Sequence, residues 1–313
     1  MREHPIFERF DMQIPHDEEG FHVNNVGVRT SLDYDKPLVM ERLPGMLTSG
    51  AVPFRRSAGN PHLPEPLSED YYEWIDLLTA IAEAKDHFVM IELGAGYGRW
   101  LANAAKALDR FRGPRIGSRF FCGVEMQGMQ FQWLQSHLDL NGVTAEQRLL
   151  LHTGVSDAVS YEIMELRKST DYSTAIQQIP GDILKKYYEA GEHLLQVDGV
   201  ALPYLIIKVV PLSDVLREAV GQGGVVDFMT IDIQGAELRA IEAAIDPVSR
   251  QVKRMHIGTH ARDIEDRLRP LLEQNGWIID RFYAGEREFD AEFGRFYIND
   301  GILSCRNSRF IAG

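Results

Sequence analysis

Apolar residues follow two patterns that alternate along most of this chain. Short apolar runs, such as 88–93 and 225–231, show little polar alternation, which is typical of strands in a parallel sheet that is covered on both faces. Between such runs, apolar residues recur at one-sided helical spacing, as in 99–108 and 212–220. This alternation predicts an α/β fold, with a mostly parallel sheet and helices on both of its faces.

The same patterns predict the remaining elements of the body. Further strands are expected at 119–124, 149–153, 252–258 and 277–283, and further helices from Ser68 onward and at 129–140 and 264–274. The helix at 129–140 is expected to turn Met129 inward, and the helix that follows Gly235 is expected to stop at Pro247. Turn residues at 299–301 predict a hairpin between 295–298 and 303–306.

Two segments depart from this regular alternation. Residues 1–68 hold eight of the fourteen prolines, so little regular secondary structure is expected there. This segment is either a substrate-facing cap or a partly disordered arm. The remaining domain, 69–313, carries an insertion at about 158–211 with extra strands and a helix. We expect both segments to shape the pocket of a second substrate and to contribute little to a cofactor site.

Three glycines in alternate positions end the first apolar run. Gly94, Gly96 and Gly98 let the backbone turn sharply and lie against a ligand, and the following helix points its positive amino end at that ligand. A dinucleotide-binding loop carries its third glycine where this chain has Arg99, so that class of ligand does not fit. The spacing of Glu92 and the glycines is instead the arrangement of S-adenosylmethionine (SAM) methyltransferases. Glu92 would lie near the amino-acid end of SAM.

Candidate binding residues also follow the next two predicted strands. Glu125 stands directly after the strand at 119–124, where an acid in nucleotide-binding α/β folds accepts hydrogen bonds from ribose hydroxyls. Its distance of 27 positions from Gly98 is somewhat long, and a loop rich in glycine and proline accounts for the excess. The third strand leads into Val155 and Ser156, where the adenine ring would rest against backbone and small side chains.

Composition and charge narrow the class of protein. The chain has 313 residues and 44% apolar content, enough for one large core or for one core with a small cap. A formal net charge of −13 argues against nucleic acid as a partner. No apolar run approaches the roughly twenty residues that cross a bilayer, and the first twenty residues are too polar for a signal peptide. Cys122 and Cys305 are the only cysteines, so neither a disulfide framework nor a cysteine-based metal site is expected. A soluble cytoplasmic protein without a membrane partner follows, and a homo-oligomer stays open.

Three segments together resemble the FkbM family of SAM-dependent O-methyltransferases. They read IELGAGYG at 91–98, VDFMTIDIQGAE at 226–237 and HIGTH at 256–260. The resemblance implies a Rossmann-like class I methyltransferase fold with a seven-stranded sheet, and SAM at the carboxyl ends of its first strands. It also implies methyl transfer to a hydroxyl of a small molecule, such as a sugar, a polyketide or another natural product. Gln234 stands where the family frequently has an acid, so no carboxylate role is carried over to that position.

Two side chains just past neighbouring strands are candidates for the chemistry. Asp232 and His260 follow the strands at 225–231 and 252–258, so both could reach one pocket beside the methyl group. Most of the catalysis can come from holding the acceptor oxygen in line with that group. A neutral imidazole can take the hydroxyl proton near neutral pH, which makes His260 the candidate base. Asp232 would orient the site or hold the SAM amino group. A satisfied structural role for His260 is the alternative.

Two other functions compete with this interpretation. In a metal-dependent O-methyltransferase, Mg²⁺ would lower the pKa of the acceptor hydroxyl, and Asp232 could be one of its oxygen ligands. Thr259 and His260 match poorly the acid pair that such a site needs, so SAM without a metal is favoured. The second alternative is a catalytically silent SAM-binding module, which has the same fold.

Overall fold

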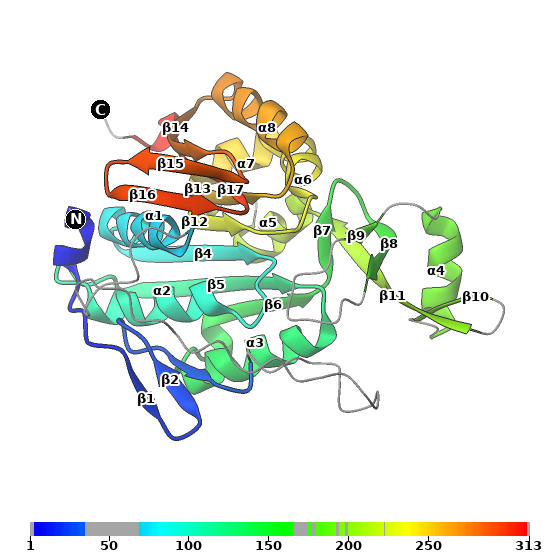
Figure 1. Ribbon diagram of the computed structural model, residues 1–313, viewed down its shortest axis with the longest axis horizontal. Coiled ribbons are helices and arrows are strands. Elements are labelled where there is room, and N and C mark those ends of the chain that lie inside the picture. Colours follow the sequence, from blue (N-terminus) through cyan, green and yellow to red (C-terminus); the bar gives the residue numbers. More distant parts are fainter. Residues whose placement is uncertain are drawn as a thin grey trace.

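A seven-stranded sheet runs through the middle of the molecule (Figure 1). The computed structural model describes residues 3–34, 69–165, 175–176, 180–191, 194–197, 200–221 and 223–311. Across the sheet, the strand order is β14 (Trp277–Tyr283), β17 (Gly301–Asn307), β13 (Val252–Thr259), β12 (Val226–Ile231), β4 (His87–Leu93), β5 (Ser118–Glu125) and β6 (Arg148–His152). The five strands from β13 to β6 are parallel, and β17 is antiparallel to both of its neighbours. This is the predicted class I methyltransferase sheet.

Helices cover both faces of the sheet. One face carries α1 (Glu69–Glu83), α2 (Arg99–Arg110) and α3 (Gly128–Leu140), and the other carries α5 (Leu212–Val220), α6 (Glu237–Ala243), α7 (Ile245–Gln251) and α8 (Arg262–Gln274). Strand β4 shows why its sequence lacks polar alternation: Phe88 and Met90 enter one hydrophobic core, while Ile91 and Leu93 enter the other. Because both faces are buried, apolar residues are favoured at successive positions.

Two predicted details of the helices are wrong. Pro247 does not end the helix that follows Gly235. That helix, α6, already ends at Ala243, and Pro247 lies in the first turn of the next helix, α7. A proline is tolerated there, since the first amides of a helix have no partner within the helix. Met129 does not point inward and is 45% exposed. It lies at the start of α3, where Leu134 and Leu138 form the buried side.

The predicted hairpin between 295–298 and 303–306 is also wrong. Strand β16 (Gly294–Ile298) pairs with β15 (Arg287–Ala291) in a separate two-stranded sheet. Strand β17 cannot pair with β16, because β13 and β14 occupy its two edges.

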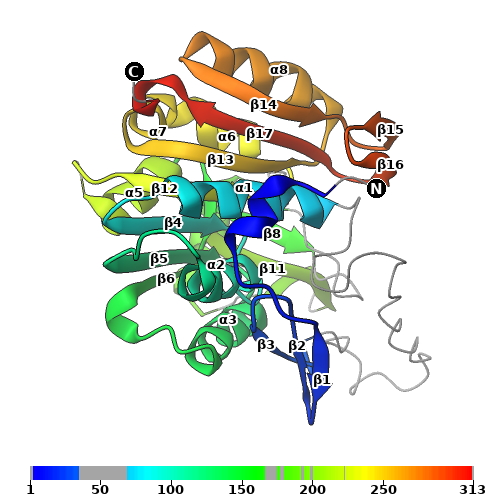
Figure 2. The ribbon, with the colours of Figure 1, turned by 90° about the vertical axis from the view of Figure 1, so that its left-hand side faces the viewer.

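The first described segment, 3–34, packs against helices α1 to α3 (Figure 2). It forms η1 (Pro5–Arg9), β1 (His16–Glu18), β2 (Phe21–Val23) and β3 (Arg29–Ser31). Its side chains Phe7, Phe10, Val26 and Val28 are at most 3% exposed and lie in the same core as Tyr71 of α1. These residues are therefore part of the hydrophobic core of the body. Residues 35–68, including the predicted helix start at Ser68, lie outside the described residues.

The insertion forms a second sheet beside the body (Figure 1). Its elements are β8 (Ser160–Glu165), β9 (Ala175–Ile176), α4 (Gly181–Glu189), β10 (Leu194–Val197) and β11 (Val200–Pro211), and β7 (Gly154–Ser156) directly precedes it. Strand β11 pairs with β8 and, in parallel, with β7. The Thr153 hydroxyl donates a hydrogen bond of 2.9 Å to the Lys208 carbonyl, so the returning strand is fastened next to the end of β6. Two short 3-10 helices, η2 (Ala145–Gln147) and η3 (Ser308–Phe310), complete the described elements.

Candidate active site

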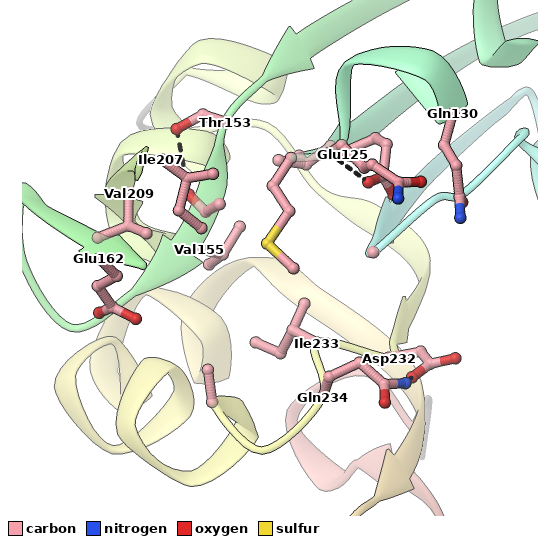
Figure 3. Close-up of a pocket in the computed structure, with 16 residues that line it drawn as sticks. Glu125, Gln130, Thr153, Val155, Glu162, Ile207, Val209, Asp232, Ile233 and Gln234 are labelled. Atoms are coloured by element: carbon pink, nitrogen blue, oxygen red, sulfur yellow. Dashed lines mark hydrogen bonds between the residues drawn. The ribbon is translucent and has the colours of Figure 1, made fainter. Parts of the chain in front are cut away.

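A cavity lies at the carboxyl ends of β4, β5 and β12, and the insertion forms its opposite wall (Figure 3). Ligands of open α/β sheets bind at this edge. The lining residues are Gly94, Val124, Glu125, Met126, Gln127, Gln130, Thr153, Gly154, Val155, Glu162, Ile207, Val209, Asp232, Ile233, Gln234 and Ala236. The strand ends of the body and strands β8 and β11 of the insertion therefore meet around one space.

The glycine loop folds tightly over the end of β5. The amides of Gly94 and Ala95 donate to the Val124 carbonyl at 3.0 and 2.9 Å. Gly94, at φ +76°, lines the cavity, and a Cβ there would lie 1.8 Å from the Asp232 carbonyl oxygen. A Cβ on Gly98 would lie 2.3 Å from the Leu134 side chain. The absence of a side chain at Gly94 thus leaves room for the end of β12, and its absence at Gly98 leaves room for helix α3. Gly98 and Gly96 are outside the lining.

Glu125 lines the cavity and is fixed by the backbone around it. Its two carboxylate oxygens accept hydrogen bonds from the amides of Gly96 and Gln127, both at 2.7 Å. Burial raises the pKa of Glu125 to about 7, and the backbone hydrogen bonds oppose this increase. Each carboxylate oxygen can accept a further hydrogen bond. The predicted contact with two ribose hydroxyls is therefore compatible with this geometry.

Glu92 contacts the start of helix α2. Its carboxylate accepts hydrogen bonds from the amides of Trp100 and Leu101 at 3.3 and 3.1 Å, in the first turn of α2. Burial raises the pKa of Glu92 well above its ordinary value, and the charge of Glu73 adds to the increase. The side chain caps a helix and is outside the cavity lining.

The predicted adenine-binding pair is divided between two environments. Val155 is 5% exposed and lines the cavity together with Ile207 and Val209 of the insertion. Ser156 is 1% exposed and outside the lining. Its hydroxyl donates to the Asp157 carboxylate at 2.8 Å. Successive residues of a strand point to opposite sides, so only one of the pair can face the cavity.

The structure brings the side chains of Asp232 and His260 into contact, but only Asp232 lines the cavity. Asp232 Oδ1 lies 3.1 Å from His260 Nε2 and accepts a hydrogen bond of 2.6 Å from Gln234 Nε2. On the other side of the ring, His260 Nδ1 lies 2.8 Å from the carboxylate of Glu237, which is fully buried. Gln234 has a φ of +51°, which is unusual for a residue with a side chain. Asp232 and Gln234 line the cavity, whereas His260 does not.

The surroundings of His260 do not favour the neutral imidazole that the sequence predicts at physiological pH. Burial lowers its pKa, but the hydrogen bonds and charges of Asp232 and Glu237 outweigh burial and raise the pKa to about 10. This pKa favours the protonated ring at neutral pH, and a protonated imidazole has no lone pair to accept a proton. The amide nitrogen of Gln234 also lies 2.8 Å from His260 Nε2. His260 is better suited to hold Asp232 in position.

The insertion contributes more to this cavity than its sequence indicated. Glu162, Ile207 and Val209 lie in the lining beside Glu125 and Val155. The insertion therefore shares one cavity with Gly94, Glu125 and Asp232. The sequence predicts an apolar strand at 205–210 within the insertion, but this pattern does not identify which cavity the strand lines.

Two further features concern membranes and metals. Within the described ranges, every helix is too short or too polar to cross a membrane. The same ranges contain no group of three or more His, Cys, Asp or Glu side chains arranged to hold a metal ion.

Taken together, the sheet order, the glycine loop and the cavity at the strand ends define a methyltransferase architecture of class I. A family model described as "Methyltransferase FkbM domain" matches residues 140–280. This range includes the predicted motifs at 226–237 and 256–260 and begins after the glycine loop. Residues 140–280 therefore match a methyltransferase FkbM domain, and the resemblance indicated by the motifs at 226–237 and 256–260 is confirmed.

Individual relatives are methyltransferases as well. The chain is 29% identical over 268 residues to a protein of Jannaschia sp. (strain CCS1) named "Putative methyltransferase", and the alignment covers 83% of each chain. The solved structure of methyltransferase FkbM from Methylobacillus flagellatus KT matches with a TM-score of 0.41 and 16% identity, over 76% of this chain and 50% of that one. Precorrin-6y C5,15-methyltransferase from Geobacter metallireducens GS-15 matches with a TM-score of 0.36 and 12% identity, over 74% and 88% of the two chains.

Proposed function

We propose that this protein transfers the methyl group of SAM to a hydroxyl of a small molecule. One observation carries the proposal: Gly94, Glu125 and Asp232 line a single cavity at the ends of three adjacent strands. The glycine permits close backbone approach, and the two carboxylates offer acceptors for hydroxyl and ammonium groups. SAM carries such groups on its ribose and on its amino-acid end.

The lining residues fit the parts of SAM in order along the cavity. Glu125 would accept hydrogen bonds from the ribose. Val155, Ile207 and Val209 form an apolar surface for the faces of the adenine ring. Asp232, beside the glycine loop, would attract the positively charged amino-acid half. SAM supplies an activated methyl group on a sulfonium sulfur, and the remaining contributions come from the residues of the chain.

These residues act mainly by positioning. SAM, when bound, would supply the methyl group and leave as S-adenosylhomocysteine (SAH). The residues of the chain would hold the acceptor oxygen in line with the methyl carbon, and the hydroxyl proton would pass to water. Alignment of this kind can supply most of the rate. The side chain of Asp232 is 42% exposed, and its Oδ1 is fixed by Gln234 and His260. It can therefore orient groups in the cavity, while His260 orients Asp232.

Transfer of labelled methyl from SAM to a panel of hydroxylated sugars and polyketides tests this proposal. Methylation at oxygen, identified by mass spectrometry and NMR, is expected for at least one acceptor. Loss of transfer in a chelator would favour the metal-dependent alternative. Tight binding of SAH without transfer to any acceptor would favour a silent module, and absence of SAH binding would contradict the SAM site itself.

Replacement of Glu125 is expected to weaken SAH binding and to remove its dependence on pH near neutrality. The pKa of Glu125 is about 7, so the better acceptor, the ionised carboxylate, predominates only above that pH. Wild-type affinity should therefore rise as the pH increases from 6 to 8. Glu125→Gln should bind more weakly at pH 8 by about 1.5 to 3 kcal/mol, the scale for hydrogen bonds to a charged group, and should show a flat profile.

Calorimetric titration with SAH at several pH values measures both effects. Glu189→Gln on α4 changes a half-exposed carboxylate away from the cavity and should leave the profile unchanged. A Glu125→Gln profile that still follows the wild type would remove Glu125 from the proposed site.

A further inference from the structure

We propose that Glu162 of the insertion recognises the 6-amino group of adenine, so that the insertion selects the base of the cofactor. The inference rests on the proposed binding of SAM. Glu162 belongs to β8, is 1% exposed and lines the cavity. Figure 3 shows it at the end of the cavity away from Glu125.

The side chains between these two carboxylates are mostly apolar. Val155, Ile207 and Val209 line the cavity beside Glu162 (Figure 3). An adenine ring has two apolar faces and a polar edge, and the 6-amino group on that edge is a hydrogen-bond donor. If the ribose lies at Glu125, a ring packed on these three side chains would direct its far edge toward Glu162. An ionised carboxylate only accepts hydrogen bonds. It can therefore accept one from an amino group but is repelled by a carbonyl oxygen.

The carboxylate of Glu162 is held in a fixed orientation. Arg239 of α6 contacts both of its oxygens, at 3.2 and 3.3 Å, and the Ser156 hydroxyl lies 3.4 Å from one of them. A two-point contact with a guanidinium fixes the plane of a carboxylate and compensates its charge within the buried site. Arg239 and the Ser156 hydroxyl contact Oε1, and Arg239 contacts Oε2. The insertion therefore presents an oriented acceptor to the cavity.

Asp157 is the natural comparison, because it is a carboxylate beside the same partners. It accepts from the Ser156 hydroxyl and lies 3.7 Å from Arg239. Its side chain is 51% exposed, and it is outside the cavity lining. Substitution of Asp157 therefore provides a matched control. It removes a negative charge near Arg239 but leaves the cavity wall unchanged.

The test is calorimetric binding of SAH and of S-inosylhomocysteine, which carries a carbonyl in place of the 6-amino group. Wild-type protein is expected to prefer SAH by roughly tenfold or more, because a site built for a donor rejects an analogue that lacks it. Glu162→Gln should reduce the preference to within about threefold, since an amide can also donate. Glu162→Asp keeps the negative charge beside Arg239, but the shorter side chain moves the carboxylate oxygens away from the cavity. This variant should also lose most of the preference for SAH. Asp157→Asn should retain the wild-type preference.

Retention of the wild-type preference in both Glu162 variants, or its loss in Asp157→Asn, would overturn the assignment. These outcomes leave the proposed function intact, because SAH still binds. Failure of the wild-type protein to bind SAH would overturn the proposed function and this inference together. Thermal unfolding of each variant verifies that a changed preference comes from a folded protein.

Discussion

Removal of residues 1–34 is expected to unfold most of the protein. The deletion takes Phe7, Phe10, Val26 and Val28 out of the core that they share with α1 and α2. Burial of one such side chain contributes about 1.5 to 3 kcal/mol, so four of them contribute on the order of the 5 to 15 kcal/mol by which a typical domain is stable. The sequence-based expectation concerns only the ligands: the segment shapes the pocket of a second substrate and contributes little to the cofactor site.

Circular dichroism during heating measures the effect. The truncated protein should lack a cooperative transition or melt far below the wild type. A graded version is Phe10→Ala, expected to lower the free energy of unfolding by about 3 to 5 kcal/mol. Ile14→Ala in the same segment is the control, because Ile14 is 49% exposed and its loss should matter by at most about 0.5 kcal/mol. A truncated protein that melts cooperatively at the wild-type temperature would show that the segment is dispensable to the core.

The second large effect is expected from His260→Ala. Removal of the imidazolium leaves the fully buried carboxylate of Glu237 without its charged partner and releases one of the two groups that hold Asp232. Breaking a buried ion pair from one side typically destabilises a protein by about 3 to 5 kcal/mol. Methyl transfer and SAH affinity should both fall, because Asp232 lines the cavity. A general base would behave differently: the rate would fall by about 10² to 10⁴ with binding unchanged.

The pH dependence of stability gives an independent test of the same cluster. The pKa of His260 in the folded protein is about 10, above the value of about 6.5 for an unfolded chain. The folded state therefore binds an additional proton between these two pH values. The stabilisation is complete below pH 6.5 and is lost as the pH rises through 10. The melting temperature of the wild type should fall over this range more than that of His260→Ala.

His16→Ala is a suitable control, since His16 has a side chain that is 53% exposed and should leave both profiles unchanged. If His260→Ala kept wild-type SAH affinity and the wild-type pH profile of stability, the ion-pair assignment would be wrong, and the role of His260 as a base would regain support.

The regular part of the fold could be predicted because its strands are buried on both faces. Apolar runs of this kind stand out in the sequence, and α5 has the predicted bounds of 212–220. The partner of β16 could not be predicted from its turn, because the choice depends on β17 already lying between β13 and β14. The packing of residues 3–34 was missed for a related reason. Their apolar residues have irregular spacing in the sequence. They are buried because they pack on the surfaces of α1 to α3.

The candidate site was predictable where backbone topology alone determines position. Gly94, Glu125 and Asp232 follow parallel strands, and the carboxyl ends of such strands meet at one edge. Side-chain direction was not predictable in the same way. Glu92 turns toward the first amides of α2, and Ser156 points away from the cavity. Glu162 was missed because its place depends on pairing with Ile207, which is 45 positions further along the chain.

The parallel pairing of β7 with β11 also bears on how this protein could diverge. Gly154, just before the insertion, lies opposite Val209 near its end, so the chain leaves and re-enters the body at adjacent points. Changes in the length of the insertion far from these points need not displace the central sheet. The entropic cost of closing a longer loop grows only slowly with its length. Substitutions near the attachment points alter the cavity wall instead. Insertions and deletions are thus expected far from the sheet. Purifying selection is expected mainly on β7 and on the end of β11.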